Sequence, residues 1–137
     1  MSQLRKGESM KPIYPGNPDD WKALYTPAMV VPAGKLAYIS GQVAFDERGA
    51  VVGVGDIVAQ AIRIFDNLGA LLKASGSDFT RVIKTNYYIT DVSLFPRVAE
   101  LRPRYFSRPY PASTMVEVKG LVHPDLLLEI EAVALVD

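Results

Sequence analysis

The segment from residue 56 to residue 76 constrains the fold more than any other part of the sequence. Its apolar residues recur at three- and four-residue intervals, the spacing of one face of an α-helix: Ile57, Ala61, Ile64, Phe65, Leu68, Leu71 and Leu72. Asp56 can cap the first turn, and Ser75-Gly76 can end the last one. A helix with one apolar face must bury that face, so we expect it to lie on a β-sheet.

The strands for this sheet are supplied by runs rich in β-branched, aromatic and other apolar residues. They span residues 28–31, 36–45, 82–89, 113–118 and 126–135. The first two runs flank Pro32-Ala33-Gly34-Lys35, so we expect them to form a hairpin with a glycine-containing turn.

A second helix is predicted to begin near Asp91 or Ser93, either of which can cap it, with Pro96 in its first turn. Its apolar face would comprise Phe95, Val98, Leu101, Tyr105 and Phe106. Pro103 lies deep inside this pattern and lacks the N–H that a helix interior requires. We therefore expect a kink there or an early change to turn geometry.

The resulting order is β-β-α-β-α-β-β, an α+β fold in one domain with both helices on one sheet face. Residues 1–26 contain several prolines and no periodicity, which predicts an irregular N-terminal arm before a domain at residues 27–137. A sheet covered on one face leaves apolar side chains on the other. We expect oligomerisation to bury them.

The composition argues against several classes of function. With 15 basic and 15 acidic residues, the chain lacks the positive excess that captures nucleic acid or an anionic membrane. It has no cysteine and one histidine, His123, so thiolate chemistry is excluded and we expect no metal site and no Ser-His-Asp triad.

Gly53-Val54-Gly55 lacks the rest of a phosphate-loop motif, and no cofactor is expected. No apolar run approaches the length of a membrane span, and a cytoplasmic location is the expectation.

Two β-type runs near the C-terminus place a hydroxyl pair and a carboxylate pair close together. The hydroxyls are Ser113 and Thr114, and the carboxylates are Glu129 and Glu131. The glutamates alternate with Leu128, Ile130 and Ala132, so both carboxylates should point to the same sheet face. They are either a polar stripe facing solvent or another subunit, or part of a site that activates water. We interpret Glu129 as functional and Glu131 as structural.

These C-terminal runs resemble those of the RidA/YjgF family of imine and enamine deaminases. Further segments similar to the family occur in the family's order, over roughly residues 26–135: Tyr38-Ile39-Ser40-Gly41-Gln42, Asp46-Glu47-Arg48-Gly49, Asn67-Leu68, Val82-Ile83-Lys84-Thr85-Asn86-Tyr87 and Thr90-Asp91-Val92. The resemblance implies a chorismate-mutase-like fold, a homotrimer, and small-molecule clefts between subunits.

The resemblance also implies site residues. In the family an arginine binds the carboxylate of a 2-imino acid, and a glutamate on the last strand positions the attacking water. Glu129 falls at the catalytic glutamate, Ser40 and Gly41 at cleft-lining positions, and Met115 where the backbone faces the ligand. The family reads Pro-Ala-Arg-Ser where this chain reads Pro-Ala-Ser-Thr, so Ser113 replaces the arginine.

Ser113 offers one neutral hydrogen bond where an arginine offers charge-assisted bonds of about 1.5–3 kcal/mol each. A substrate carboxylate would then need another cation. Arg102, Arg104 and Arg108, on or just after the second helix, are the candidates. For any one of them, covering a solvated helix face is the commoner role. Tyr25 is a candidate for replacing a lost family tyrosine.

Two functions remain after this comparison. The first is hydrolysis of an imine or enamine metabolite other than the short 2-imino acids, with Glu129 as the catalytic residue and Ser113, Met115, Ser40, Gly41 and Arg102 as substrate-binding residues. The alternative is a trimer that binds a small metabolite without turnover, as a sensor or scavenger. The retained glutamate favours the enzyme, and the missing arginine favours the binder. Ribonuclease activity has little support, since the chain has neither a basic patch nor a histidine pair.

Overall fold

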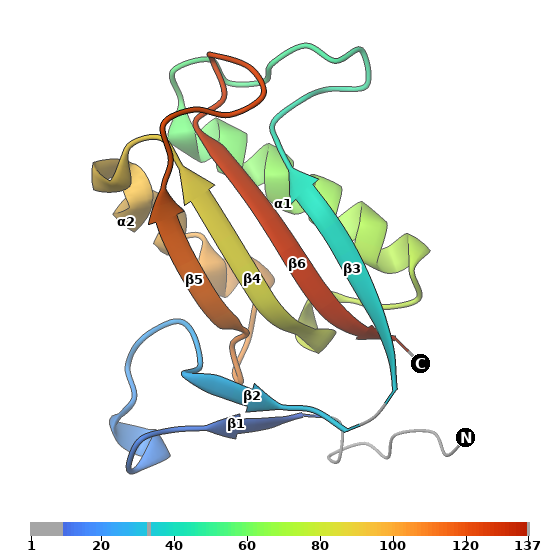
Figure 1. Ribbon diagram of the computed structural model, residues 1–137, viewed down its shortest axis with the longest axis vertical. Coiled ribbons are helices and arrows are strands. Elements are labelled where there is room, and N and C mark those ends of the chain that lie inside the picture. Colours follow the sequence, from blue (N-terminus) through green and yellow to red (C-terminus); the bar gives the residue numbers. More distant parts are fainter. Residues whose placement is uncertain (1–9, 33, 137) are drawn as a thin grey trace.

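The computed structural model of the chain describes residues 10–32 and 34–136. Its main sheet has four strands in the order β3-β6-β4-β5: β3 (Lys35–Gln42), β4 (Val82–Ile89), β5 (Ala112–Glu117) and β6 (Leu128–Val136). The central strand β6 is antiparallel to both β3 and β4, whereas β5 is parallel to β4 (Figure 1). The predicted α+β fold is confirmed.

The long helix α1 (Ile57–Ala74) begins and ends where the sequence predicts. The Asp56 side chain accepts hydrogen bonds from the backbone N–H groups of Val58 and Ala59, and the chain leaves the helix through Gly76 at φ 79°. Its apolar residues lie on the sheet together with those of the second helical region, on a single face (Figure 1). The predicted layering, with helices on one face only, is therefore confirmed.

The second helical region is divided. Asp91 caps a 3₁₀ turn at Val92–Leu94, which leads into α2 (Phe95–Ala99), and a separate short helix α3 (Arg102–Tyr105) follows. Pro96 lies in the first turn of α2, as predicted, and Pro103 lies in the first turn of α3. The kink expected at Pro103 is thus a break between two helices, because a new first turn needs no N–H from proline.

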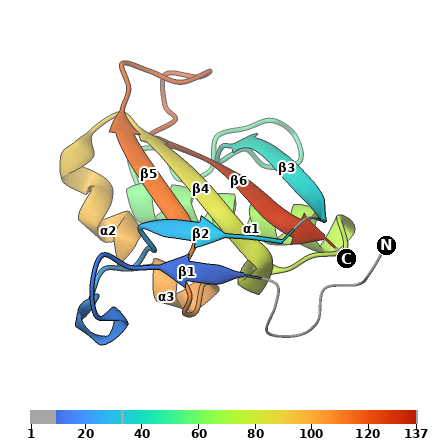
Figure 2. The ribbon, with the colours of Figure 1, turned by 60° about the horizontal axis from the view of Figure 1, so that its bottom comes forward.

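The predicted hairpin between residues 28–31 and 36–45 is wrong. Strand β2 (Ala28–Val30) pairs antiparallel with β1 (Lys11–Ile13) in a separate two-stranded sheet, and β3 pairs with β6 instead. Pro32 has no N–H for a ladder. Strands β1 and β2 run at an angle to the strands of the main sheet, so β2 and β3 do not lie side by side (Figure 2).

The N-terminal arm is partly regular where it is described. Besides β1 it contains a 3₁₀ turn at Pro18–Asp20, capped by Asn17, while residues 1–9 of the predicted arm lie outside the described residues. Thr26 joins this arm to the main sheet. It forms a parallel bridge with Ala112, and its hydroxyl donates to the Tyr110 carbonyl at 2.8 Å. The arm therefore lies against the start of β5.

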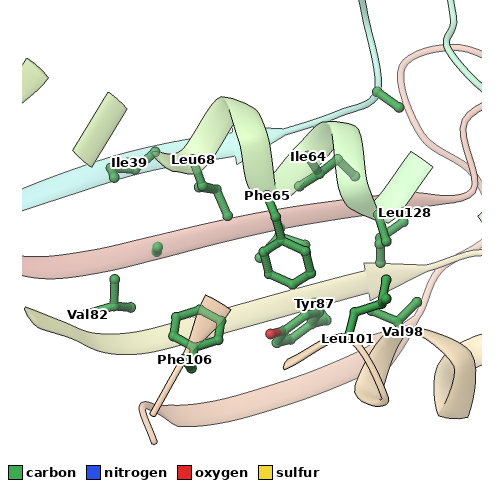
Figure 3. Packing of buried hydrophobic residues seen from close by; sticks show 14 of the residues in the cluster. Ile39, Ile64, Phe65, Leu68, Val82, Tyr87, Val98, Leu101, Phe106 and Leu128 are labelled. Carbon is green, nitrogen blue, oxygen red and sulfur yellow. The ribbon is translucent and has the colours of Figure 1, made fainter. Parts of the chain in front are cut away.

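The core lies between the helices and the sheet. Phe65 from α1 stacks on Tyr105 with ring centroids 4.4 Å apart and meets Phe106 edge-on with ring centroids 6.0 Å apart. Phe65 and Phe106 lie in the layer between α1 and the sheet (Figure 3). Tyr87 from β4 lies fully buried beside them. Burying such aromatic and aliphatic side chains contributes about 1.5–3 kcal/mol each.

The other sheet face, which we call the open sheet face, is uncovered in the single chain. It carries large apolar side chains that are well exposed, among them Tyr38 at 77%, Val116 at 42% and Leu36 at 39%. Among the helices of the described segments, none is long and apolar enough to cross a membrane.

Candidate functional site

The two glutamates of β6 lie on the open sheet face, as predicted. Glu129 and Glu131 are partly exposed, while the residues between and beside them are buried against the helices. In the ladder with β4, Glu129 is opposite Tyr88 and Glu131 is opposite Asn86. The four side chains therefore form one polar group in the middle of this face.

Glu131 is fixed by two hydrogen bonds. Its Oε1 accepts from Asn86 Nδ2 at 2.8 Å and from the Tyr88 hydroxyl at 2.7 Å. The bond to Glu131 is also the main reason that the pKa of Tyr88 is raised, since the phenol must keep its proton to donate. Neither Asn86 nor Tyr88 could be assigned to this group from the sequence, because the β4–β6 register brings them there.

Glu129 has a different environment. No hydrogen bond between described residues ends on its carboxylate, and its pKa is raised, first by burial and second by the negative charge of Glu131. A raised pKa makes a carboxylate a better proton acceptor near neutral pH. Of the two glutamates, Glu129 is thus the one suited to acid–base chemistry.

A β-bulge makes room for this carboxylate. Ile39 pairs with Ala132 and Gln42 pairs with Ile130, so two residues, Ser40 and Gly41, lie opposite Glu131 alone. A Cβ atom on Gly41 would lie 2.2 Å from Oε2 of Glu129. Any side chain at position 41 would displace the carboxylate, so Gly41 lies against Glu129, and Ser40 lies next to it in the bulge, opposite Glu131.

Beside Glu131 the open sheet face is hollowed into a depression of about 400 Å³. Its lining comprises Tyr38, Ile39, Ser40, Lys84, Asn86, Glu131, Ala132 and Val133. Lys84 points its ammonium group to the Thr114 hydroxyl at 2.8 Å. The depression combines one cation, one fixed carboxylate and apolar walls, which is a suitable surface for a small polar molecule.

Ser113 does not join this group. It is opposite Thr85 in β4, which is in turn opposite the buried Ala132, and the Thr85 hydroxyl donates to the Ser113 Oγ at 3.1 Å. Its side chain therefore lies on the helix-covered face, as does that of Met115, which packs against the core. Within one chain Ser113 and Glu129 point to opposite faces of the sheet.

Arg102 is buried, with 7% of its surface exposed. Its guanidinium carbon lies 4.9 Å from the ring centre of Tyr87 and 5.0 Å from that of Phe95, and an Nη donates to the Leu24 carbonyl at 3.3 Å. Its Nε is buried and has no hydrogen-bond partner among the described residues. A solvated helix-face role is therefore wrong for Arg102.

Arg102 lies on the same sheet face as Ser113, linked to it through neighbouring side chains. Burial raises the pKa of Tyr87, while the charge of Arg102 and hydrogen bonds with Thr85 and Arg102 lower it. Thr85 in turn contacts Ser113. One guanidinium and three hydroxyl groups thus gather beneath the start of β5.

The other arginines and Tyr25 are placed differently. Arg104 and Arg108 are exposed, and Arg108 donates to the Trp21 carbonyl of the arm. Tyr25 is half-buried with its ring edge-on to Trp21 at 5.4 Å. Arg102 is the member of the predicted arginine set that lies near Ser113.

In residues 10–32 and 34–136, no group of three or more His, Cys, Asp or Glu side chains is arranged to hold a metal ion. His123 lies in the loop before β6, where its Nδ1 accepts from the Asp125 N–H at 3.0 Å. This bond explains the histidine as a local turn contact.

The comparison with known proteins agrees with these observations. The sequence model of the endoribonuclease L-PSP family matches residues 20–136. The chain is 41% identical over 110 residues to protein DfrA of Myxococcus xanthus, covering 80% of this chain and 83% of that protein. It is 35% identical over 111 residues to the 2-iminobutanoate/2-iminopropanoate deaminase of Homo sapiens, covering 81% of this chain and 79% of that enzyme.

Solved structures share the fold. RidA from an Antarctic Psychrobacter species superposes with a TM-score of 0.70 at 30% identity, covering 99% of this chain and 100% of that chain. A Rid-family protein of Yersinia pestis gives a TM-score of 0.77 at 23% identity, covering 93% and 99%, and supports the fold alone. The family model matches residues 20–136, and the human enzyme and the Psychrobacter RidA are 35% and 30% identical to this chain. The chain therefore belongs to the RidA/YjgF family, also described as the endoribonuclease L-PSP family.

Proposed function

We propose that the protein hydrolyses the C=N bond of an imine, or of the imine tautomer of an enamine, with Glu129 as the catalytic residue. The observation that carries this proposal is the placement of Glu129: partly buried, without a hydrogen-bond donor among the described residues, beside a bulge that leaves space at Gly41. A relative at 35% identity that is named as an imine deaminase supports the same reaction class.

The reaction follows from the chemistry of a positioned carboxylate. Glu129 takes a proton from a water molecule as the water oxygen bonds to the imine carbon. Glu129 passes this proton to the substrate nitrogen, which gives a carbinolamine. The carbinolamine hydroxyl then loses its proton as the C=O bond forms, the nitrogen takes up that proton, and the C–N bond breaks. The products are ammonia and a carbonyl compound. Each step moves only protons and the electron pairs of these bonds, so no cofactor or oxidant is required.

The substrate cleft is proposed to lie between chains of a homotrimer. Ser113 and Glu129 face opposite sides of one sheet, so they can line a common cleft only when supplied by different copies. The apolar side chains of the open sheet face, such as Tyr38 and Val116, also need a partner surface. Met115, Ser40 and Gly41 are proposed to line the same clefts.

We therefore expect light scattering to give three times the chain mass of 15.0 kDa at micromolar concentration. As a test of the surface, Tyr38→Glu should weaken this assembly, because it places a charge among apolar neighbours. The exposed substitution Glu100→Gln is the control and should leave the mass unchanged. A wild-type mass equal to that of one chain would contradict the proposed cleft between chains.

The anionic end of the substrate is proposed to meet Arg102 rather than an arginine on β5. The guanidinium is held between the Tyr87 and Phe95 rings, and its Nε has no partner among the described residues and can donate. One buried and unpaired N–H on the same sheet face as Ser113 differs from the two-pronged fork that binds a small carboxylate. The site should then prefer a substrate larger than the short 2-imino acids.

Hydrolysis of 2-iminopropanoate and 2-iminobutanoate is accordingly expected to be slow. Losing even one charge-assisted bond of about 1.5–3 kcal/mol lowers kcat/KM by about 10- to 150-fold. The measurement generates each imine with an amino-acid oxidase and follows its disappearance, with the human relative assayed in parallel. Equal rates for the two proteins would contradict this assignment of Ser113.

A second candidate function is a trimer that binds a metabolite without turning it over. The replacement of the family arginine by Ser113 favours it. Calorimetry that detects binding of a carboxylate metabolite, with no ammonia released from any imine, would support the binder. RNA cleavage is not proposed, because the chain has a balanced charge and a single histidine.

A further inference from the structure

The second carboxylate of the open sheet face, Glu131, has no role in the reaction described above. We propose that Glu131, held in place by Asn86 and Tyr88, is a positioning residue whose fixed negative charge makes Glu129 a stronger proton acceptor toward the attacking water. The inference rests on the proposed function of Glu129 and adds a second carboxylate to that site.

The geometry of the strand gives the first argument. Residues two apart on a β-strand point to the same face about 7 Å from each other, so the two carboxylates are close neighbours. Glu131 cannot swing away from Glu129 freely, because Asn86 Nδ2 and the Tyr88 hydroxyl both hold its Oε1. Its charge therefore has a fixed position relative to Glu129.

The other titratable groups on this face are less able to act on Glu129. On β4, Tyr88 is opposite Glu129 but is neutral while it donates to Glu131, and Lys84 lies four residues away, about 13 Å along the strand. That separation exceeds a Debye length of about 8–10 Å. The ammonium of Lys84 is also directed to Thr114 on the outer strand.

The remaining strands contribute no nearby charge among the described residues. On β3, Gly41 lies against the Glu129 carboxylate, Ser40 is uncharged, and the titratable Tyr38 lies further along the strand, opposite Val133. On β5, Thr114 and Val116 share the open sheet face, and both are uncharged. Within one chain, Glu131 is thus the nearest charge to Glu129 among the strands of this face, in agreement with its contribution to the raised pKa of that carboxyl.

A titration of the full chain tests this inference without any substrate. Carbon-13 NMR follows the side-chain carboxyl of Glu129, assigned by its absence in Glu129→Gln. Glu131→Gln keeps an oxygen that can accept from Asn86 and Tyr88 but removes the charge, so the Glu129 titration midpoint should move to lower pH. Tyr88→Phe removes one of the two bonds that hold Glu131, and it should move the midpoint in the same direction by less.

Glu100→Gln removes an exposed carboxyl outside the site and is the matched control, with no expected change. A Glu129 midpoint unchanged in both Glu131→Gln and Tyr88→Phe would overturn the inference, and Tyr88→Phe alone decides if Glu131→Gln does not fold. Once a substrate is identified, the acid limb of the kcat profile should shift with the NMR midpoint. Absence of activity on every imine, with the NMR shift present, would instead contradict the proposed function.

Discussion

Glu129→Gln is expected to lower kcat for the protein's imine substrate by about 10²- to 10⁴-fold, the usual contribution of a positioned general base. The amide keeps the shape of the side chain and its fit over Gly41, but it cannot take a proton from water. Ammonia release under saturating substrate measures the effect. Full activity in this variant would mean that Glu129 is structural and that another group activates water.

The same substitution should not destabilise the fold at neutral pH. The folded-state pKa of Glu129 lies above the ordinary value of 4.5, so the folded chain binds more protons than the unfolded chain between those two pKa values. Stability therefore falls as pH rises through that window. Urea unfolding should show Glu129→Gln equal to or more stable than wild type at pH 7, with the difference lost at low pH.

The control for the activity measurement is Glu100→Gln, whose carboxyl is exposed outside the site. Glu131→Gln, although it lies on the same strand face, is unsuitable as a neutral control because its charge acts on Glu129. We expect Glu131→Gln to change the pH dependence of kcat while retaining most of the activity at its optimum.

Gln60→Leu is expected to destabilise the protein by about 3–5 kcal/mol, the largest loss of stability that we predict. Gln60 is fully buried in the first turns of α1, and its amide nitrogen donates to the carbonyls of Gly53 at 3.1 Å and Asp125 at 2.9 Å. Its Oε1 accepts from the Leu127 N–H at 2.8 Å. Leucine leaves all three backbone groups without their partner in a packed site.

Urea unfolding at one fixed protein concentration measures this loss, because assembly makes stability depend on concentration. The matched control is Gln42→Leu, since the Gln42 amide donates only to the Ser40 carbonyl in an exposed contact at 3.0 Å. That change should stay within about 0.5 kcal/mol. Equal stabilities of the two variants would show that the buried amide contributes nothing.

Gln60 also affects the site. Leu127 is two residues before Glu129, so the bond from Gln60 fixes the chain where it enters β6. We expect Gln60→Leu to lower activity as well as stability. Its spacing of three residues from Ile57 and four from Ile64 places Gln60 on the apolar face of α1, but the sequence carries no signal for the distant backbone groups that its amide binds.

Local periodicity allowed the sequence to predict individual elements. The three- and four-residue spacing of apolar side chains and the Asp56 cap define α1, and β-branched and aromatic composition defines β4 at Val82–Ile89. Alternation along β6 places Glu129 and Glu131 on one face. These features depend on neighbours in the chain, whose geometry is the same in any protein.

Pairing between elements depended on tertiary structure. Adjacent runs at residues 28–31 and 36–45 suggested a hairpin, but β3 pairs with β6, which is distant in the sequence. Apolar side chains of both strands pack in the core under the helices. The burial of Arg102 between the Tyr87 and Phe95 rings likewise follows from how α3 packs on the sheet. Sequence spacing carries no information about such contacts.

The candidate site shows most directly which features the sequence determines and which depend on the tertiary structure. By itself the sequence determined the fold class, through periodicity, and the position of Glu129 on its strand. Only the tertiary structure decided that Ser113 faces the helices while Glu129 faces the open sheet, because Thr85 is paired with both Ser113 and Ala132. The register between two strands decides which of their side chains point to the same face of the sheet. A shift of one residue moves every side chain of a strand to the other face, and packing across the whole sheet selects the register.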